Sequence, residues 1–196
     1  MPAETTSPPS PTAATRHWLL RTVIGENFCP FAKREFERNS IHYQVCTESG
    51  FEQQALCVMQ ECERLMAHDE IETTLVIFSP TEPSAGRDHN IEAFDDFLAL
   101  ADQVNWLMQR AQLDGTLQLA TFHPRYVFAG EDESSPSHYT NRAPFPTLHL
   151  IRERSIDRAL KTFKDPDSIP QTNIQRTLEQ GAEFYQTILT ESLLQQ

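Results

Sequence analysis

Hydrophobic residues in this chain alternate between the two-residue period of β-strands and the three-to-four-residue period of α-helices. This alternation limits the possible folds more than any other feature. Strand–helix–strand units require crossover connections within one sheet. We therefore predict an α/β (or α+β) fold with a four-stranded mixed sheet covered by helices. The predicted strands are Ile41–Cys46, Thr74–Phe78, Leu117–Phe122 and Thr147–Ile151, and the predicted helices between the first three are Gly50–Ala67 and Ile91–Gln112.

The segments outside this alternation divide into a tail and further helices. Residues 1–12 are mostly proline, serine and threonine, and such a composition predicts a disordered tail. We expect residues 13–196 to form a single globular domain. The last two strands are expected to pair antiparallel across a long loop, whose length favours a functional role. The remaining predicted helices are Ala13–Ile24, stopped by Gly25, then Cys29–Arg38, Ser155–Phe163 and Gln171–Leu193.

The charge of the chain argues against several classes of partner. A formal net charge of −12 repels phosphate backbones, so we expect no nucleic acid and no anionic membrane as partner. No apolar run is long enough to span a bilayer, and the N-terminus lacks the pattern of a secretory signal. We therefore expect a cytoplasmic protein whose four cysteines are free thiols. The sequence does not predict the oligomeric state.

Two histidines on otherwise apolar strands mark the region of greatest chemical interest. His123 follows the third predicted strand and His149 lies within the fourth. Antiparallel pairing is expected to place both side chains on the same side of the sheet, within about 10 Å of each other. Together with the nearby Asn141, Arg142 and Arg152, they can form a pocket for a small anion. In that pocket the histidines would be catalytic, as acid and base, and the other three side chains would bind the ligand.

Several motifs resemble one known family. They are G-x-N-x-CPFA at residues 25–32, TTLVIFSP at 73–80, ATFHPRYVFAG at 120–130 and, most specifically, YTNRAPFPTLHLIRERSIDRA at 139–159. In this order they are similar to the bacterial family catalogued as domain of unknown function 1415, over nearly the whole chain after the tail. The resemblance implies a small soluble bacterial protein and no particular activity. This chain departs from the family by an acidic, proline-rich insertion around residues 81–89.

Cys29 offers a second kind of chemistry. A thiol at a helix N-terminus is acidified by the backbone dipoles and becomes a better nucleophile, so Cys29 is a candidate catalytic residue. The stretch from Cys29 to Val45 is also similar to the C-P-F-C, helix and strand of a glutaredoxin, and the element order resembles a thioredoxin fold. Ala32 stands where the second active-site cysteine would be, and a helix precedes Cys29 instead of a strand. The alternative is that Cys29 is a small buried hydrophobic residue.

We assign no metal and no cofactor, because the chain has no local ligand motif and no C-x-x-C pair. Cys29, His123 and His149 would make an acceptable zinc set if the fold brought them together. The other histidines are expected to be solvated surface residues: His17, His42, His68, His89 and His138.

Three hypotheses of different classes remain open. The first, which we favour at this point, is an enzyme or binding protein for an anionic metabolite. The second is a monothiol redox protein that uses Cys29. The third is a non-catalytic interaction protein whose motif loop braces the sheet. A deep pocket lined by the histidines and Arg142 would favour the first, whereas motif side chains saturated by structural hydrogen bonds would favour the third.

Overall fold

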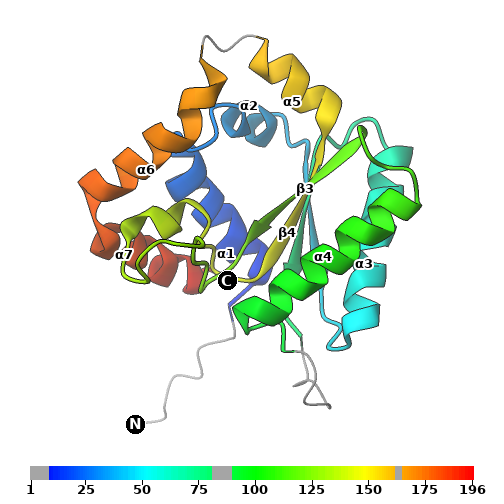
Figure 1. Ribbon diagram of the computed structural model, residues 1–196, viewed down its shortest axis with the longest axis horizontal. Coiled ribbons are helices and arrows are strands. Elements are labelled where there is room, and N and C mark those ends of the chain that lie inside the picture. The colour runs from blue at the N-terminus through cyan, green and yellow to red at the C-terminus, as the bar shows by residue number, and fades with distance from the viewer. Residues whose placement is uncertain (1–8, 81–89, 162–164) are drawn as a thin grey trace.

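The computed structural model describes residues 9–80, 90–161 and 165–196, and it shows a mixed sheet between two layers of helices (Figure 1). The strand order is β1-β2-β4-β3. The strands β1 (Ile41–Cys46) and β2 (Thr73–Phe78) are parallel, whereas β4 (Thr147–Arg152) runs antiparallel to both β2 and β3 (Leu117–Phe122). The predicted α/β class and four-stranded mixed sheet are confirmed. The order of strands and helices along the chain from β1 to β4 also agrees with the expected one. Within the sheet, β1 lies at one edge.

Both faces of the sheet are buried at β2, where every residue after Thr73 is buried. Its alternate side chains enter two separate cores. On one side Val76 and Phe78 pack under α3 (Phe51–Ala67) and α4 (Phe94–Arg110). The opposite core contains Leu75 and Ile77 from β2, together with side chains from several helical segments. Among them are α1 (Pro11–Trp18), the π-helix η1 (Leu19–Ile24) and α7 (Ala182–Leu193), which lie on the other side of the sheet from α3 and α4 (Figure 1).

The N-terminal helix begins earlier than expected. Ser10 caps α1 by accepting a hydrogen bond from the backbone N–H of Ala13, and Pro11 occupies the first turn. The backbone N–H of Ser10 also donates to the carbonyl of Gln195 at 3.1 Å. The helix therefore begins within the segment whose composition predicts disorder, and Ser10 and Pro11 serve there as helix-starting signals. Residues 1–8 and the insertion at 81–89, which includes His89, lie outside the described residues.

Two other predicted helices differ most from the elements observed. The helix expected from Cys29 is the short α2 (Ala32–Glu37), which is preceded by turns. The long C-terminal helix is interrupted at Gly181, whose φ of 80° and ψ of 161° are open essentially to glycine alone. The chain therefore forms α6 (Ile169–Gln180) and then α7.

The remaining elements are short. They are α5 (Glu153–Leu160) and the 3-10 helices η2 (Pro136–Thr140) and η3 (Pro166–Ser168). Of the helices in the described ranges, none has both the length and the apolar character needed to cross a membrane.

Candidate functional site

The two strand histidines lie on opposite faces of the sheet, so the expected shared pocket does not form. In the β3–β4 ladder Phe122 is opposite Thr147 and Ala120 is opposite His149. Directly paired residues project to the same face, so His149 shares its face with Ala120 and Phe122. His123 follows Phe122 and packs against α4 on the other face. The expectation was wrong because a register differing by one residue exchanges the faces of a whole strand.

His123 is completely buried and both of its ring nitrogens are occupied. The backbone N–H of Arg125 donates to Nδ1 at 3.0 Å, which leaves the proton on Nε2 to be donated to the carbonyl of Ile91 at 3.2 Å. The rings of Phe94 and Phe97 lie 5.3 and 5.1 Å from the imidazole. Loss of solvent lowers the pKa of His123 to about 4, against the opposing effect of the Ile91 carbonyl. His123 is therefore neutral at pH 7.

His149 is partly buried on the opposite face and is also held neutral. The Thr73 hydroxyl donates to the carbonyl of Leu150 at 2.6 Å, so its oxygen accepts from Nε2 of His149, also at 2.6 Å. The ring of Phe122 lies 6.1 Å from the imidazole. Desolvation lowers the pKa of His149 to about 4. This side chain ties β2 to β4.

His138 was expected on the surface, and that expectation was wrong. It is completely buried within η2. Its Nδ1 accepts from the backbone N–H of Phe128 at 3.2 Å, and its Nε2 donates to the carbonyl of Asp132 at 2.8 Å. His138 thus holds the preceding loop against η2. Periodicity could not reveal this role, because the partners are backbone groups of an irregular loop.

Asn141 and Arg142 make contacts within the same loop region. The Asn141 side chain donates to the carbonyl of Thr121 at 3.1 Å, and the backbone carbonyl of Asn141 accepts from the backbone N–H of His123 at 3.1 Å. Arg142 donates through Nε to the carbonyl of Tyr126 at 3.1 Å, and its guanidinium carbon lies 4.8 Å from the centre of the Tyr139 ring. Both side chains therefore fix the backbone at the end of β3 and just after it to the segment that follows η2.

Arg152 is bonded to backbone carbonyls at the end of α3. It is buried, with 4% of its surface exposed. It donates from Nε to Ile71 at 3.1 Å and from one terminal nitrogen to His68 at 2.9 Å and to Leu65. Carbonyls at a helix C-terminus lack partners within the helix, and a cation complements the helix dipole there. Arg152 therefore joins α3 to β4.

Cys29 does not have the environment of an activated thiol. Burial raises its pKa, and the backbone N–H groups of Phe31 and Ala32 offset this only in part. The basic residues that follow Cys29 in the chain pair with carboxylates: Lys33 lies 3.9 Å from Glu37, and Arg34 lies 3.7 Å from Glu35. The direction of the pKa shift is opposite to the one predicted for a reactive thiolate.

The zinc set considered from the sequence is not assembled, because the sheet separates His123 from His149. Among the residues that the structure describes, no group of three or more histidine, cysteine or acidic side chains is placed to hold a metal ion.

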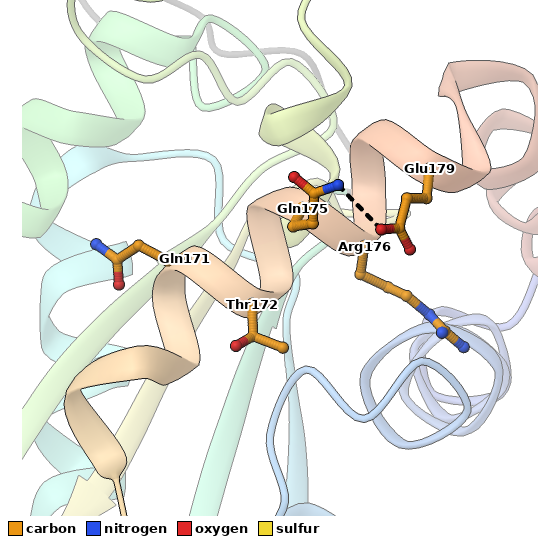
Figure 2. Close-up of a pocket in the computed structure, with 5 residues that line it drawn as sticks. All are labelled: Gln171, Thr172, Gln175, Arg176 and Glu179. Atoms are coloured by element: carbon orange, nitrogen blue, oxygen red, sulfur yellow. Dashed lines mark hydrogen bonds between the residues drawn. The ribbon is translucent and has the colours of Figure 1, made fainter.

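Two open hollows occur elsewhere on the surface. One, of about 440 Å³, lies between the ends of α3 and α4, and Met59, Met66 and Leu113 are among its lining residues. The other, of about 490 Å³, lies along α6 (Figure 2). It is lined by Gln171, Thr172, Gln175, Arg176 and Glu179. Sequence reasoning missed this surface, because it treated α6 and α7 as one helix and proposed no site there.

Comparison with known proteins gives one match. The model of a family described as "Protein of unknown function (DUF1415)" matches residues 10–187. Neither the curated proteins nor the solved structures contain a match.

Proposed function

The chain belongs to the DUF1415 family of proteins of unknown function, and we propose that it is a non-catalytic interaction protein that binds a partner through α6. One observation carries this proposal: the polar side chains of the motif region donate to or accept from backbone groups. This is the case for His123, His138, Asn141, Arg142 and Arg152. Side chains committed in this way shape the fold and leave few groups for a ligand or a reaction.

The braced loop supports α6. This helix packs on η2. Tyr139, a residue of η2, in turn anchors η2 to α7. The hydroxyl of Tyr139 donates to Gln186 of α7 at 3.0 Å, and its ring stacks on that of Tyr185 at 5.5 Å. We infer that the motif residues act indirectly, by fixing the platform on which α6 rests.

The outer surface of α6 is almost entirely exposed. Within this helix only Thr177 is buried, and its hydroxyl donates to the carbonyl of Ile174. Two polar contacts fix the helix at its inner edge: Asn173 donates to the carbonyl of Phe28 at 2.8 Å, and Arg176 pairs with Glu26 at 2.9 Å. Most side chains of α6 are thus exposed and contribute little to the core, which favours a role in binding.

The exposed face of α6 has the chemistry of a helix-binding surface. Ile174 and Leu178, exposed by 37% and 51%, are one helical turn apart and therefore adjacent. Beside them lie Gln175 and Glu179, which are joined by a hydrogen bond of 2.9 Å (Figure 2). An apolar pair flanked by polar groups fits a partner helix with its own apolar stripe.

The proposal is tested first against the alternative of a small anionic ligand. The melting temperature of the wild type is measured with and without phosphate or citrate. If Arg142 braces the loop, neither anion stabilises the wild type, and Arg142→Ala melts lower in plain buffer because the Tyr126 carbonyl loses its partner. A wild type stabilised by the anion, beside an Arg142→Ala variant of unchanged melting temperature that the anion does not stabilise, would support the pocket and contradict our proposal.

The binding surface is tested by photo-crosslinking in cells that express the full chain. A photoreactive residue at position 175 is expected to crosslink to a partner protein. The double variant Ile174→Gln and Leu178→Gln should keep the wild-type melting temperature, because both side chains are exposed, and should lose the crosslink. The matched control changes Leu98 and Trp106, which are exposed on α4, and should keep it. A crosslink that survives the α6 variant, or its absence from the wild type, would reject α6 as the binding surface.

A further inference from the structure

A hollow opens on the surface where α3 and α4 both end. The two helices lie side by side on one face of the sheet (Figure 1). Ala67 is the last residue of α3 and Ala111 follows the last residue of α4, and both line this hollow of about 440 Å³. Its walls also include Met59, Met66 and Leu113. Aliphatic and thioether groups therefore make up most of the wall.

An exposed apolar stripe on α3 continues from the hollow. Met59 and Met66 follow Leu56 by three and ten residues, so all three lie on one face of the helix. Leu56 and Met66 are exposed by 57% and 46%, and Met59 is partly buried. The stripe is about 15 Å long at the rise of an α-helix. A small molecule seated in the hollow would leave Leu56 in water, whereas a helix of about three turns laid along α3 covers the whole stripe.

The charged side chains within the stripe are acidic. Glu52 is four residues before Leu56 and Glu63 is three before Met66, so both carboxylates lie among the apolar groups. Glu63 also lines the hollow. Both glutamates are exposed, and neither forms an ion pair within the part of the chain that the structure describes. This face of α3 therefore combines apolar groups with negative charge.

The arginines nearest to the stripe are held by other side chains. Arg64 is the one basic residue of α3, and its Nε lies 3.1 Å from Oε1 of the buried Glu61. Arg110, in the last turn of α4, places its guanidinium carbon 5.7 Å from the centre of the Trp106 ring. A cation that complements the stripe must therefore come from another molecule.

We propose that α3, together with the hollow at its carboxyl end, binds a basic amphipathic helix of a partner protein. Apolar side chains of that helix cover Leu56 and Met59 and fill the hollow beside Met66, while its lysines or arginines lie at Glu52 and Glu63. Methionine is flexible and polarisable, so this surface adapts to apolar side chains of different shapes.

The charge of the chain argues for a different protein as the partner. Each copy carries a formal net charge of −12, so pairing of two copies through this face would bring two acidic surfaces together. The proposal is independent of the proposed role of α6, because it rests on the exposed side chains and charges of α3 and on the hollow between α3 and α4.

The experiment adds a synthetic peptide of leucine and lysine in amphipathic helical order to the full chain. The methionine methyl groups of the chain are isotope-labelled and observed by NMR. We expect the Met59 and Met66 signals to shift, whereas that of Met108, which is buried in the core, stays in place. An otherwise identical peptide with glutamate at every lysine position should shift neither Met59 nor Met66. Single Met→Leu variants assign the signals.

Variants of α3 measure the contribution of each kind of contact to the peptide affinity. The double variant Leu56→Gln and Met66→Gln should weaken binding by about tenfold or more, because the apolar contact is lost. Both side chains are exposed, so its melting temperature should remain that of the wild type. Glu63→Gln should weaken binding by about threefold at low salt concentration and by less at high salt.

The matched controls replace exposed apolar pairs on other helices. Leu98→Gln with Trp106→Gln changes α4, and Ile174→Gln with Leu178→Gln changes α6. Both double variants should bind the basic peptide as the wild type does. The α6 variant thus separates this proposal from the proposed function, because failure of either one leaves the other standing.

Several outcomes would overturn the proposal. One is a basic peptide that shifts neither Met59 nor Met66, and another is an acidic peptide that binds equally well. A Leu56→Gln and Met66→Gln variant with the wild-type affinity would do the same. Shifts caused by hexyltrimethylammonium and not by the peptide would assign the hollow to a small amphiphile. Dimers of the wild type in sedimentation, absent from the α3 double variant, would assign the surface to a second copy.

Discussion

Ala120 and His149 face each other across the β3–β4 ladder. This pairing places His149 on the sheet face covered by α1 and α7, while His123 projects into the core beneath α4. The two histidines thus serve two different packing layers. Each is neutral; His123 bonds through both ring nitrogens within the fold and His149 bonds through Nε2 to Thr73, so their effect should appear in stability.

Stability is expected to fall as the pH is lowered from about 6.5 to about 4. Folding lowers the pKa of His123 and His149 from 6.5 to about 4, so in this range the unfolded chain binds protons that the folded chain does not. Each histidine can contribute on the order of 3 kcal/mol at neutral pH that is lost by about pH 4. Urea unfolding of the wild type and of His149→Gln, which retains a donor for Thr73, measures the His149 share. The difference between the two should shrink at low pH, and a constant difference would contradict the assignment.

Replacement of Arg152 by alanine should destabilise the fold strongly. The change leaves the carbonyls of Leu65, His68 and Ile71 without their donor, at about 1–3 kcal/mol for each acceptor that stays buried. The neighbouring Arg154 pairs with Asp69 on the surface, where both side chains are well exposed, so Arg154→Ala is the control and should have no measurable effect. Equal unfolding midpoints for the two variants would show that Arg152 does not brace α3.

Replacement of Gly181 by alanine should cost about 1–3 kcal/mol, since its backbone angles are open essentially to glycine alone. Asparagine, which tolerates the left-handed helical region, should not rescue the loss, because the ψ of 161° lies outside that region. Thermal unfolding of Gly181→Ala and Gly181→Asn provides the measurement. An alanine variant as stable as the wild type would mean that α6 and α7 can join as one helix.

Alkylation of Cys29 by iodoacetamide should be slower than that of an unstructured cysteine peptide at pH 7.5. Burial raises the pKa of this thiol, so less of it is ionised, and its rate should keep rising at a pH where the peptide rate has levelled off. Mass spectrometry of the labelled peptide against pH gives both rates. Rapid labelling of Cys29 near neutral pH would return the monothiol redox hypothesis to consideration.

Local sequence patterns were sufficient to place the strands. The alternation at Ile41–Cys46 and the continuous apolar run before Phe78 predict elements that the structure contains. They also predict that β2 is buried on both faces. These inferences succeed because backbone periodicity and side-chain polarity are properties of neighbouring residues.

Breaks in regular structure were harder to predict. Gly181 interrupts the C-terminal helix pattern, and Pro11 begins a helix in a segment whose composition suggested disorder. In both cases one residue's backbone preference outweighed the composition of the segment around it.

The sequence by itself determined the elements, the double burial of β2 and the family to which the chain belongs. The tertiary structure alone decided that His123 and His149 are on opposite faces and that Arg142 and Arg152 bond to backbone carbonyls. The physical reason is that register and packing join residues distant in sequence. A shift of one position in the pairing of β3 with β4 would leave each strand pattern unchanged and yet exchange the faces of its side chains.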